Sequence, residues 1–345
     1  HRDEDQKTPA MIPRLDTPGH TPAWQKELAR GFSSVEALLE HLGINPRPPW
    51  PAVAAGFPLR VPRGFVDRME HGNMDDPLLR QVLPVAAENM PQPDYSRDPL
   101  EERHAMPVPG LLHKYHGRAL LTLTGACAVH CRYCFRRHFP YSEANPLGTR
   151  RDQAIDYLRT QPEIGELILS GGDPLSLPDT RLSELASQLA GIGHLHTLRI
   201  HTRLPVVLPE RVDAPLLDWL SQVPQRVVMV LHCNHPNEIN AAVRDAMQDL
   251  QRAGILLLNQ SVLLRQINDN ADTLARLSEK LLQVGILPYY LHQLDRVQGA
   301  AHFAVDDDTA CTLMDTLHAR LPGYMVPRLV RELPGQPGKS PLWPQ

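Results

Sequence analysis

Residues 118–139, RALLTLTGACAVHCRYCFRRHF, decide the fold of this 345-residue chain. The stretch begins with an apolar run over 120–124, which predicts a short buried strand. It continues into a segment that carries Cys127, Cys131 and Cys134 in the spacing C-x-x-x-C-x-x-C. Three thiols so close in sequence can bind one metal centre. The end of this strand is therefore expected to lie at a functional site.

Short apolar runs alternate with amphipathic segments after this stretch, which is typical of βα units and a parallel sheet. One intervening helix is predicted to begin at Asn237 and end at Gly254, and another, with Leu274, Leu277 and Leu281, to end before Gly285. Six βα units fit an α/β fold, a partial six-stranded relative of the eight-stranded TIM-type barrel. The six strands are predicted over 120–124, 167–170, 198–201, 227–232, 255–260 and 287–292.

Polar residues follow each predicted strand, at the edge where barrels of this type carry their active sites. In strand order they are Cys127, then Gly171 to Asp173, His201 with Arg203, His232, Gln260 and Asp295.

Three regions are expected along the chain. Residues 1–110 form an irregular, mostly helical extension that is rich in proline, with a helix predicted over 34–42. Its first 60 or so residues are expected to pack against the barrel or a partner subunit. Residues 111–305 form the barrel, and residues 306–345 form a C-terminal helix followed by a cofactor-binding segment.

Composition excludes several classes of protein. A net charge of -4 argues against direct nucleic-acid binding. No apolar run has the length of a membrane span, and the polar N-terminal stretch HRDEDQKTPA lacks an apolar signal segment, so a cytoplasmic location is expected. Five cysteines, three of them clustered, do not form a secreted disulfide framework, and Cys233 and Cys311 are interpreted as ordinary thiols.

The cysteine motif allows two interpretations. Iron–sulfur clusters are normally held by four thiolates, so three would leave one iron of a 4Fe-4S cluster open to the amino and carboxylate groups of S-adenosylmethionine (SAM). A structural zinc site completed by His130 or His138 is the alternative.

The motif, combined with Ser170-Gly171-Gly172-Asp173-Pro174 after the second strand, resembles the radical SAM superfamily. The resemblance implies a 4Fe-4S cluster and SAM as cofactors. Consecutive glycines allow close backbone approach to a ligand, here the amino-acid part of SAM. Three further residues are expected on the SAM side, although each is also explained as a core residue: His201, His232 and Gln260.

From about residue 60 to the end, the chain resembles the lysine 2,3-aminomutase family, and within it the aminomutases that form (R)-β-lysine for bacterial elongation factor P. The matching segments are PGLLHKYHGRALL, CRYCFRRHFPY, SGGDPL, NHPNEI, LNQSVLLRQINDN and PYYLHQLDRVQGAAHF. The resemblance implies that Lys339, in a Gly/Pro-rich loop, forms a Schiff base with pyridoxal 5'-phosphate (PLP). It also places three residues near that cofactor: Lys114, Tyr115 and Arg118.

The same resemblance implies L-lysine as substrate and an aminomutase, an isomerase, as the activity. Arg136 matches the position that binds the substrate carboxylate, with Arg137 as a competing candidate. Asp295 and Glu332 match two acids that bind the distal ammonium, and Glu332 departs from the pattern because better-known members have aspartate there.

Partners follow from the resemblance as well. An electron donor protein is expected, together with an indirect link to elongation factor P through a β-lysine ligase. Because no cysteine follows Cys311, the zinc-linked tetramer of clostridial-type members is not expected, and a homodimer is possible. Two alternatives stay open: a radical SAM enzyme without PLP acting on another substrate, and a non-enzymatic metal-binding protein.

Overall fold

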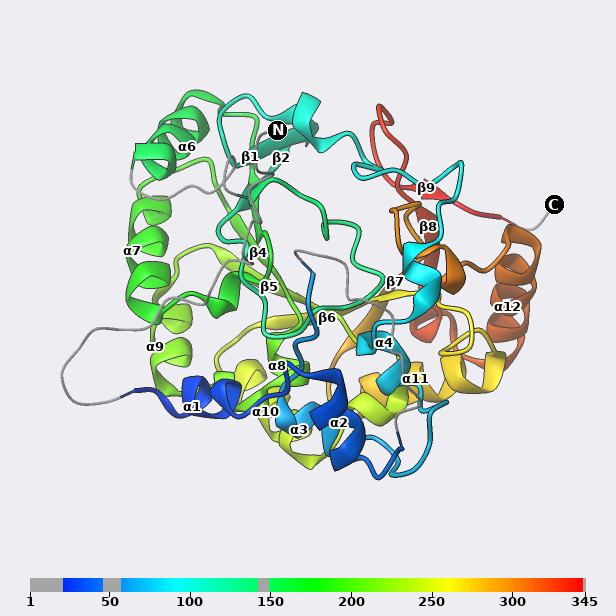
Figure 1. Ribbon diagram of the computed structural model, residues 1–345. Coiled ribbons are helices and arrows are strands. Elements are labelled where there is room, and N and C mark those ends of the chain that lie inside the picture. The colour runs from blue at the N-terminus through cyan, green and yellow to red at the C-terminus, as the bar shows by residue number, and fades with distance from the viewer. Residues whose placement is uncertain (1–20, 46–56, 142–148, 344–345) are drawn as a thin grey trace, which may run out of the picture.

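All nine strands belong to one sheet and follow one another in sequence order (Figure 1). The computed structural model describes residues 21–45, 57–141 and 149–343. The strands are β1 Leu111–Tyr115, β2 Arg118–Thr122, β3 Glu166–Ser170, β4 Thr197–Thr202, β5 Arg226–Leu231, β6 Leu256–Val262, β7 Leu287–His292, β8 Arg328–Arg331 and β9 Ser340–Pro341.

Strands β2 to β8 run parallel, while β1 and β9 pair antiparallel with β2 and β8 at the two edges. The α/β partial barrel predicted from the sequence is therefore confirmed. The parallel part is one strand longer than predicted, because β8 joins β7. That strand has only four residues, with an arginine at each end, so it has no apolar run to reveal it.

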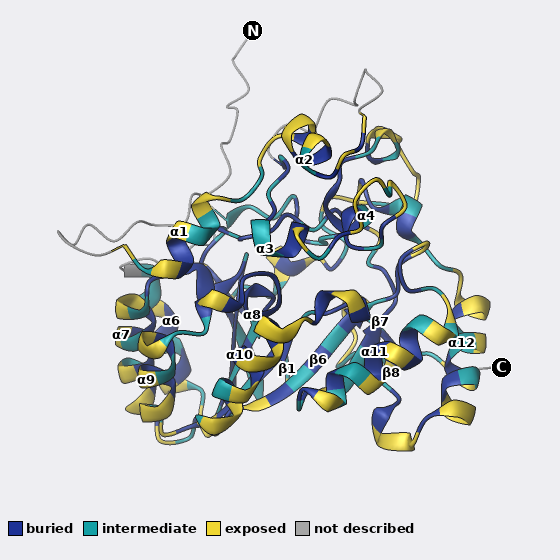
Figure 2. Cartoon of the chain, turned by 90° about the horizontal axis from the view of Figure 1, so that it is seen from below, coloured by how far each residue is buried: buried dark blue, intermediate teal, exposed yellow. Residues whose placement is uncertain are grey.

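Helices on the outside of the sheet connect the parallel strands (Figure 1). Figure 2 shows exposed residues on their outer faces and buried residues toward the strands. None of the helices in the described ranges has the length and apolar character of a membrane span. The longer helices are α6 Thr149–Thr160, α7 Asp179–Ala190, α9 Ala214–Gln222, α10 Ala241–Arg252, α11 Ala271–Gln283 and α12 Asp307–Arg320, and α8 Leu204–Val207 is a single turn.

Capping residues set where the helices begin and end, and one predicted helix start is wrong. Helix α10 begins after Asn240, whose side chain accepts a hydrogen bond from the amide of Val243, and not at Asn237 as predicted. Asn237 instead lies in the 3-10 turn η5, Pro236–Glu238, because Pro236 starts a separate turn. Gly254 and Gly285 follow α10 and α11 with φ of +82° and +80°, the left-handed conformation that ends a helix, as predicted.

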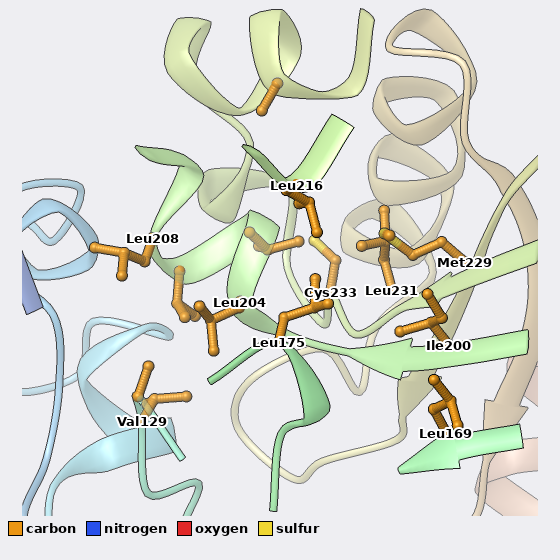
Figure 3. Close-up of a cluster of buried hydrophobic side chains, with 14 of the residues drawn as sticks. Val129, Leu169, Leu175, Ile200, Leu204, Leu208, Leu216, Met229, Leu231 and Cys233 are labelled. Atoms are coloured by element: carbon orange, nitrogen blue, oxygen red, sulfur yellow. The ribbon is translucent and has the colours of Figure 1, made fainter. Parts of the chain in front are cut away.

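The core lies between the sheet and these helices. Figure 3 shows Leu169 of β3, Ile200 of β4 and Leu231 of β5 gathered with Leu216 of α9. Cys233 is fully buried among them, which supports its interpretation as a packed thiol. Strand side chains alternate: in β4, Leu198 and Ile200 are buried against helices, whereas the next residues along the strand face the barrel interior.

The N-terminal extension packs on the barrel over its described residues. It contains α1 Ala23–Ala29, α2 Val35–His41, α3 Arg63–Val66, α4 Leu79–Val82 and the 3-10 turns η1 Ala86–Asn89 and η2 Glu102–Ala105. Trp24 of α1 is buried and lies 4.8 Å from the guanidinium carbon of Arg211. The helix predicted over 34–42 is α2, capped by Ser34.

The extension also holds the cysteine segment. The carboxylate of Glu88 in η1 accepts two hydrogen bonds from Arg132, at 2.9 and 2.6 Å, and one from Arg137, at 2.8 Å. All three side chains are buried. The amide of Arg132 also donates to the carbonyl of Gln81 in α4, at 2.9 Å. The segment carrying the cysteines is thus tied to residues far away in sequence.

Replacing Glu88 by glutamine removes the negative charge that pairs with both Arg132 and Arg137. We expect the Glu88→Gln variant to lose about 3–5 kcal/mol of unfolding free energy, the usual cost of breaking a buried ion pair on one side. Urea denaturation followed by circular dichroism measures this loss.

Asp249→Asn is the matched control, because it breaks an exposed pair with Arg252 on α10. Its expected loss is under about 0.5 kcal/mol. Equal losses in the two variants would contradict a special role for Glu88.

Candidate active site

A cavity of about 550 Å³ opens at the C-terminal ends of the parallel strands and extends into the barrel. It is lined by the residues to which the resemblance assigned a cofactor or substrate, and not by the alternatives Arg137 and His138: Lys114, Tyr115, Arg118, Cys127, Cys131, Cys134, Arg136, Ser170, Gly171, Gly172, Asp173, His201, His232, Gln260, Asp295, Glu332 and Lys339.

The three clustered cysteines are free thiols on one wall of this cavity. Burial raises the pKa of Cys127 well above its ordinary value, and burial together with Cys131 raises the pKa of Cys134 to about 11. Both thiols therefore carry protons that a bound metal would displace. A guanidinium nitrogen of Arg203 lies 2.7 Å from the sulfur of Cys131, a donor suited to a thiolate.

Both histidines that could complete a zinc site make other contacts. His130 uses Nδ1 to contact the Pro58 carbonyl at 2.7 Å and stacks on Phe57, and His138 contacts the carbonyl of Gln298. Among the described residues, no group of three or more His, Cys, Asp or Glu side chains surrounds one point. The donor set fits a cluster whose irons each take a separate thiolate.

The glycine segment after β3 packs on the cysteine segment. A β-carbon on Gly171 would lie 2.5 Å from the carbonyl oxygen of Thr124, and one on Gly172 would lie 2.4 Å from that of Ala126. Gly171 also has φ of +130°, which favours glycine. The close approach thus involves the protein's own backbone, whereas the sequence analysis explained it by a ligand alone.

Asp173 is buried and directed into the protein. Its carboxylate accepts hydrogen bonds from the hydroxyl of Thr202 at 2.7 Å and from the amides of Leu175, Arg203 and Leu204. It therefore fixes the turn after β4 at the cavity edge.

Two histidines and a glutamine lie together at the ends of three neighbouring strands. The His201 and His232 ring centroids are 6.3 Å apart, and the amide nitrogen of Gln260 lies 3.3 Å from Nε2 of His232. Nε2 of His201 is buried and has no hydrogen-bond partner within the described part of the chain. An unpartnered polar atom at a cavity wall fits a bound polar ligand such as SAM.

Lys339 reaches the cavity from the edge of the sheet formed by β9. It precedes β9, which pairs with β8, and its Nζ lies 3.1 Å from Nε2 of His292 and 4.7 Å from the Tyr290 ring centroid. Burial lowers the pKa of Lys339 to about 8, against the opposing effect of Glu332 and Asp295. A buried amine with this pKa fits a covalent bond to an aldehyde cofactor.

The three residues predicted near PLP line the same cavity as Lys339, and two of them contact Glu332. The hydroxyl of Tyr115 donates to Glu332 at 2.9 Å, and Nζ of Lys114 is 3.5 Å from the same oxygen. The guanidinium of Arg118 lies over the Tyr115 ring at 4.6 Å. Glu332 is therefore oriented by its neighbours.

Arg136 and Arg137 point to different places. Arg136 lines the cavity and donates to Glu102 and to the hydroxyl of Ser170. Arg137 turns away from the cavity and donates to buried Glu88. Only Arg136 can contact a ligand in the cavity, which resolves the ambiguity between the two.

Asp295 is an acid with a perturbed pKa. Burial, with a smaller contribution from nearby Glu332, raises the pKa of Asp295 to about 7. It therefore changes charge near neutral pH.

Several cavity residues were not assigned from the sequence: Glu102, Arg199, Arg203, Tyr290 and His292. His292 ends a predicted strand, and Arg203 was noted after another, so position along the strands was a usable signal for both. Glu102 has no such signal, because it lies in the irregular extension.

Comparison with known proteins gives a consistent result. No family model matches the chain. L-lysine 2,3-aminomutase from Escherichia coli (strain K12) is 50% identical over 336 residues, which cover 96% of this chain and 98% of that protein. The Haemophilus influenzae protein of the same name is 48% identical, covering 92% and 94%, and that of Clostridium subterminale is 34% identical, covering 93% and 78%.

A crystal structure of a radical SAM methyltransferase from Sphaerobacter thermophilus aligns with 64% of this chain and 68% of its own, at 16% identity. Its TM-score of 0.45 is too low to support an argument about activity. The sequence relatives are far closer and nearly full-length, and the chain belongs to the L-lysine 2,3-aminomutase family.

Proposed function

We propose that this protein converts L-lysine to β-lysine, using a 4Fe-4S cluster, SAM and PLP. The observation that carries the proposal is a single cavity with the cysteine triad on one wall and the buried amine of Lys339 on another. The close relatives named L-lysine 2,3-aminomutase support the same reaction. Membership of that family favours this function over the non-enzymatic alternative.

Each cofactor has residues suited to hold it. We assign the cluster to Cys127, Cys131 and Cys134, and PLP to Lys339, with Lys114, Tyr115 and Arg118 beside it. When bound, the cluster and SAM supply a hydrogen-abstracting radical, and PLP supplies a ring that delocalises the unpaired electron. SAM is assigned to the remaining wall: Ser170, Gly171, Gly172, Asp173, His201, His232 and Gln260.

The substrate is held at both ends. Arg136 offers a planar fork to the α-carboxylate, and Asp295 and Glu332 offer negative charge to the distal ammonium. Two acids at that end favour lysine over an acidic amino acid.

Burial sets the protonation state of His292, the neighbour of Lys339. His292 is kept neutral, because burial lowers its pKa well below the ordinary value. A neutral imidazole 3.1 Å from Nζ of Lys339 can accept a hydrogen bond from it, which orients the amine.

The wider context follows from this activity. We propose that an electron donor protein reduces the cluster and that β-lysine, in the (R) form, is passed through a ligase to elongation factor P in the cytoplasm. We also propose a homodimer and the three-part division at residues 110 and 305. Along the chain, β8 and β9 of the last part complete the sheet.

An anaerobic assay of reconstituted protein with L-lysine, SAM, PLP and dithionite tests the reaction. We expect β-lysine from the wild type and none, below about 1% of the rate, from Lys339→Ala or Cys131→Ala, since each loses a cofactor attachment. Lys339→Ala should also lose the visible absorbance of lysine-bound PLP, and Cys131→Ala most of its iron.

Two controls match these variants. Cys311→Ala, on α12 away from the cavity, should keep iron and activity, and Lys26→Ala, exposed on α1, should keep PLP. Formation of 5'-deoxyadenosine without β-lysine would reject the substrate or the PLP assignment, and zinc without iron would reject the enzyme.

The pKa of Asp295 predicts a pH dependence. Below about pH 7 its carboxyl is protonated and cannot pair with the substrate ammonium, so kcat/KM should fall about tenfold per unit on the acid side. Above pH 7 the charge is present and this dependence disappears. A pH profile of kcat/KM between 5.5 and 9 measures it.

Asp295→Asn is the matched variant, since it keeps the shape and removes the titrating group. We expect a lower kcat/KM at pH 8 and loss of the step near pH 7. An unchanged step in this variant would assign it to another group.

A further inference from the structure

Glu102 lines the cavity, yet the scheme above gives it no function. We propose that Glu102 is a positioning residue that orients Arg136 to bind the α-carboxylate of the substrate. This inference rests on the proposed function and deepens it at the carboxylate end of the pocket.

The contact between the two side chains has two points. Nε of Arg136 donates to Oε2 of Glu102 at 2.9 Å, and Nη2 donates to Oε1 at 2.8 Å. Two parallel bonds set both the direction and the plane of the guanidinium, which one bond does not. The Phe135 and Phe139 rings lie 4.9 and 5.6 Å from its central carbon and limit its movement further.

This arrangement leaves part of the Arg136 guanidinium able to bind a ligand. Glu102 takes the Nε side of the guanidinium, and Nη1 donates to the hydroxyl of Ser170 at 2.9 Å. Three of the five guanidinium donors are thus engaged, and two on the terminal nitrogens have no partner among the residues that the structure describes. A carboxylate can accept from both, so Glu102 supports this contact and does not block it.

The position of Glu102 is itself strongly constrained. Its side chain is buried, with the residue only 4% exposed, and its amide donates to Asp98 at 3.2 Å. Glu101, just before it, has φ of 51°, a left-handed conformation that costs free energy for a residue other than glycine. Backbone strain of this kind persists where surrounding contacts enforce it, often at functional sites.

Glu102 also connects the two ends of the pocket. Nζ of Lys114 lies 3.4 Å from Glu102 and 3.5 Å from Glu332. Lys114 therefore contacts both Glu102, which holds Arg136, and Glu332, which lies at the end of the pocket proposed for the substrate ammonium. Burial alone would raise the pKa of Glu102, but Arg136 and Lys114 lower it below the ordinary value, so its charge is retained.

Glu102→Gln tests the proposal, because it keeps the shape and removes the charge. We expect the KM for L-lysine to rise about tenfold, as for loss of a charged hydrogen bond, with a smaller change in kcat. The inhibition constant of 1,5-diaminopentane, which lacks the carboxylate, should change less than about twofold. In an Arg136→Ala background, Glu102→Gln should add no further loss of kcat/KM for lysine.

Asp179→Asn is the matched control. Asp179 pairs with buried Arg211 at 2.8 Å, outside the cavity, so this variant also takes an acid from a buried arginine, which keeps its longer contact with Asp213 at 3.4 Å. It should lower the melting temperature while leaving the ratio of the lysine KM to the diamine inhibition constant unchanged. Should Glu102→Gln fail to fold, Glu102→Asp keeps the charge with a shorter reach, and the same rise in that ratio is expected.

The outcomes are distinguishable. Equal changes for lysine and the diamine, or none for either, in a protein whose wild type forms β-lysine would overturn this inference alone. A wild type that forms no β-lysine would overturn the proposed function and this inference with it.

Discussion

Buried arginines of the cysteine segment must be paired with acids, and the geometry of the active site depends on those pairs. Arg132 and Arg137 share Glu88, and Arg136 is held by Glu102. Both acids come from the N-terminal extension. A guanidinium cannot be buried without a partner at acceptable cost, so the fold of the extension and the placement of the three cysteines depend on each other.

The same principle links a fourth arginine to the cavity wall that carries the cysteines. Arg203, after β4, is buried between Glu238 at 2.8 Å and the sulfur of Cys131 at 2.7 Å. Its other nitrogen contacts reach Gln81 of the extension and Tyr133 of the cysteine segment. Strand ends, extension and cysteine segment thus meet in one polar network beneath the cavity, which is rigid because its charges are paired.

The opposite wall is built by a hairpin. Strands β8 and β9 pair through Val330 with Pro341 and Arg331 with Ser340, which brings Glu332 and Lys339 to the same cavity beside the end of β7. Burial at this wall shifts the proton equilibria of Lys339 and Asp295 in opposite directions. The lysine pKa falls and the aspartate pKa rises, and the chemistry is poised near neutral pH.

The sequence by itself determined six of the seven parallel strands, because each of those six carries a visible apolar run, which β8 lacks. It also placed the residues that follow the strands, since parallel strands end at one edge: the cysteines, Ser170 to Asp173, His201, His232, Gln260 and Asp295 all line the cavity. The position of Lys339 came from family resemblance, not from any pattern in its loop.

Only the tertiary structure decided which arginine faces the cavity, which acids hold it, and that the glycines press on the cysteine backbone. These features join segments tens of residues apart through single contacts, such as Glu102 with Arg136, and contacts of that kind leave no local period in the chain. Local patterns report the face that a residue buries. They do not report the partner that its charge meets across the fold.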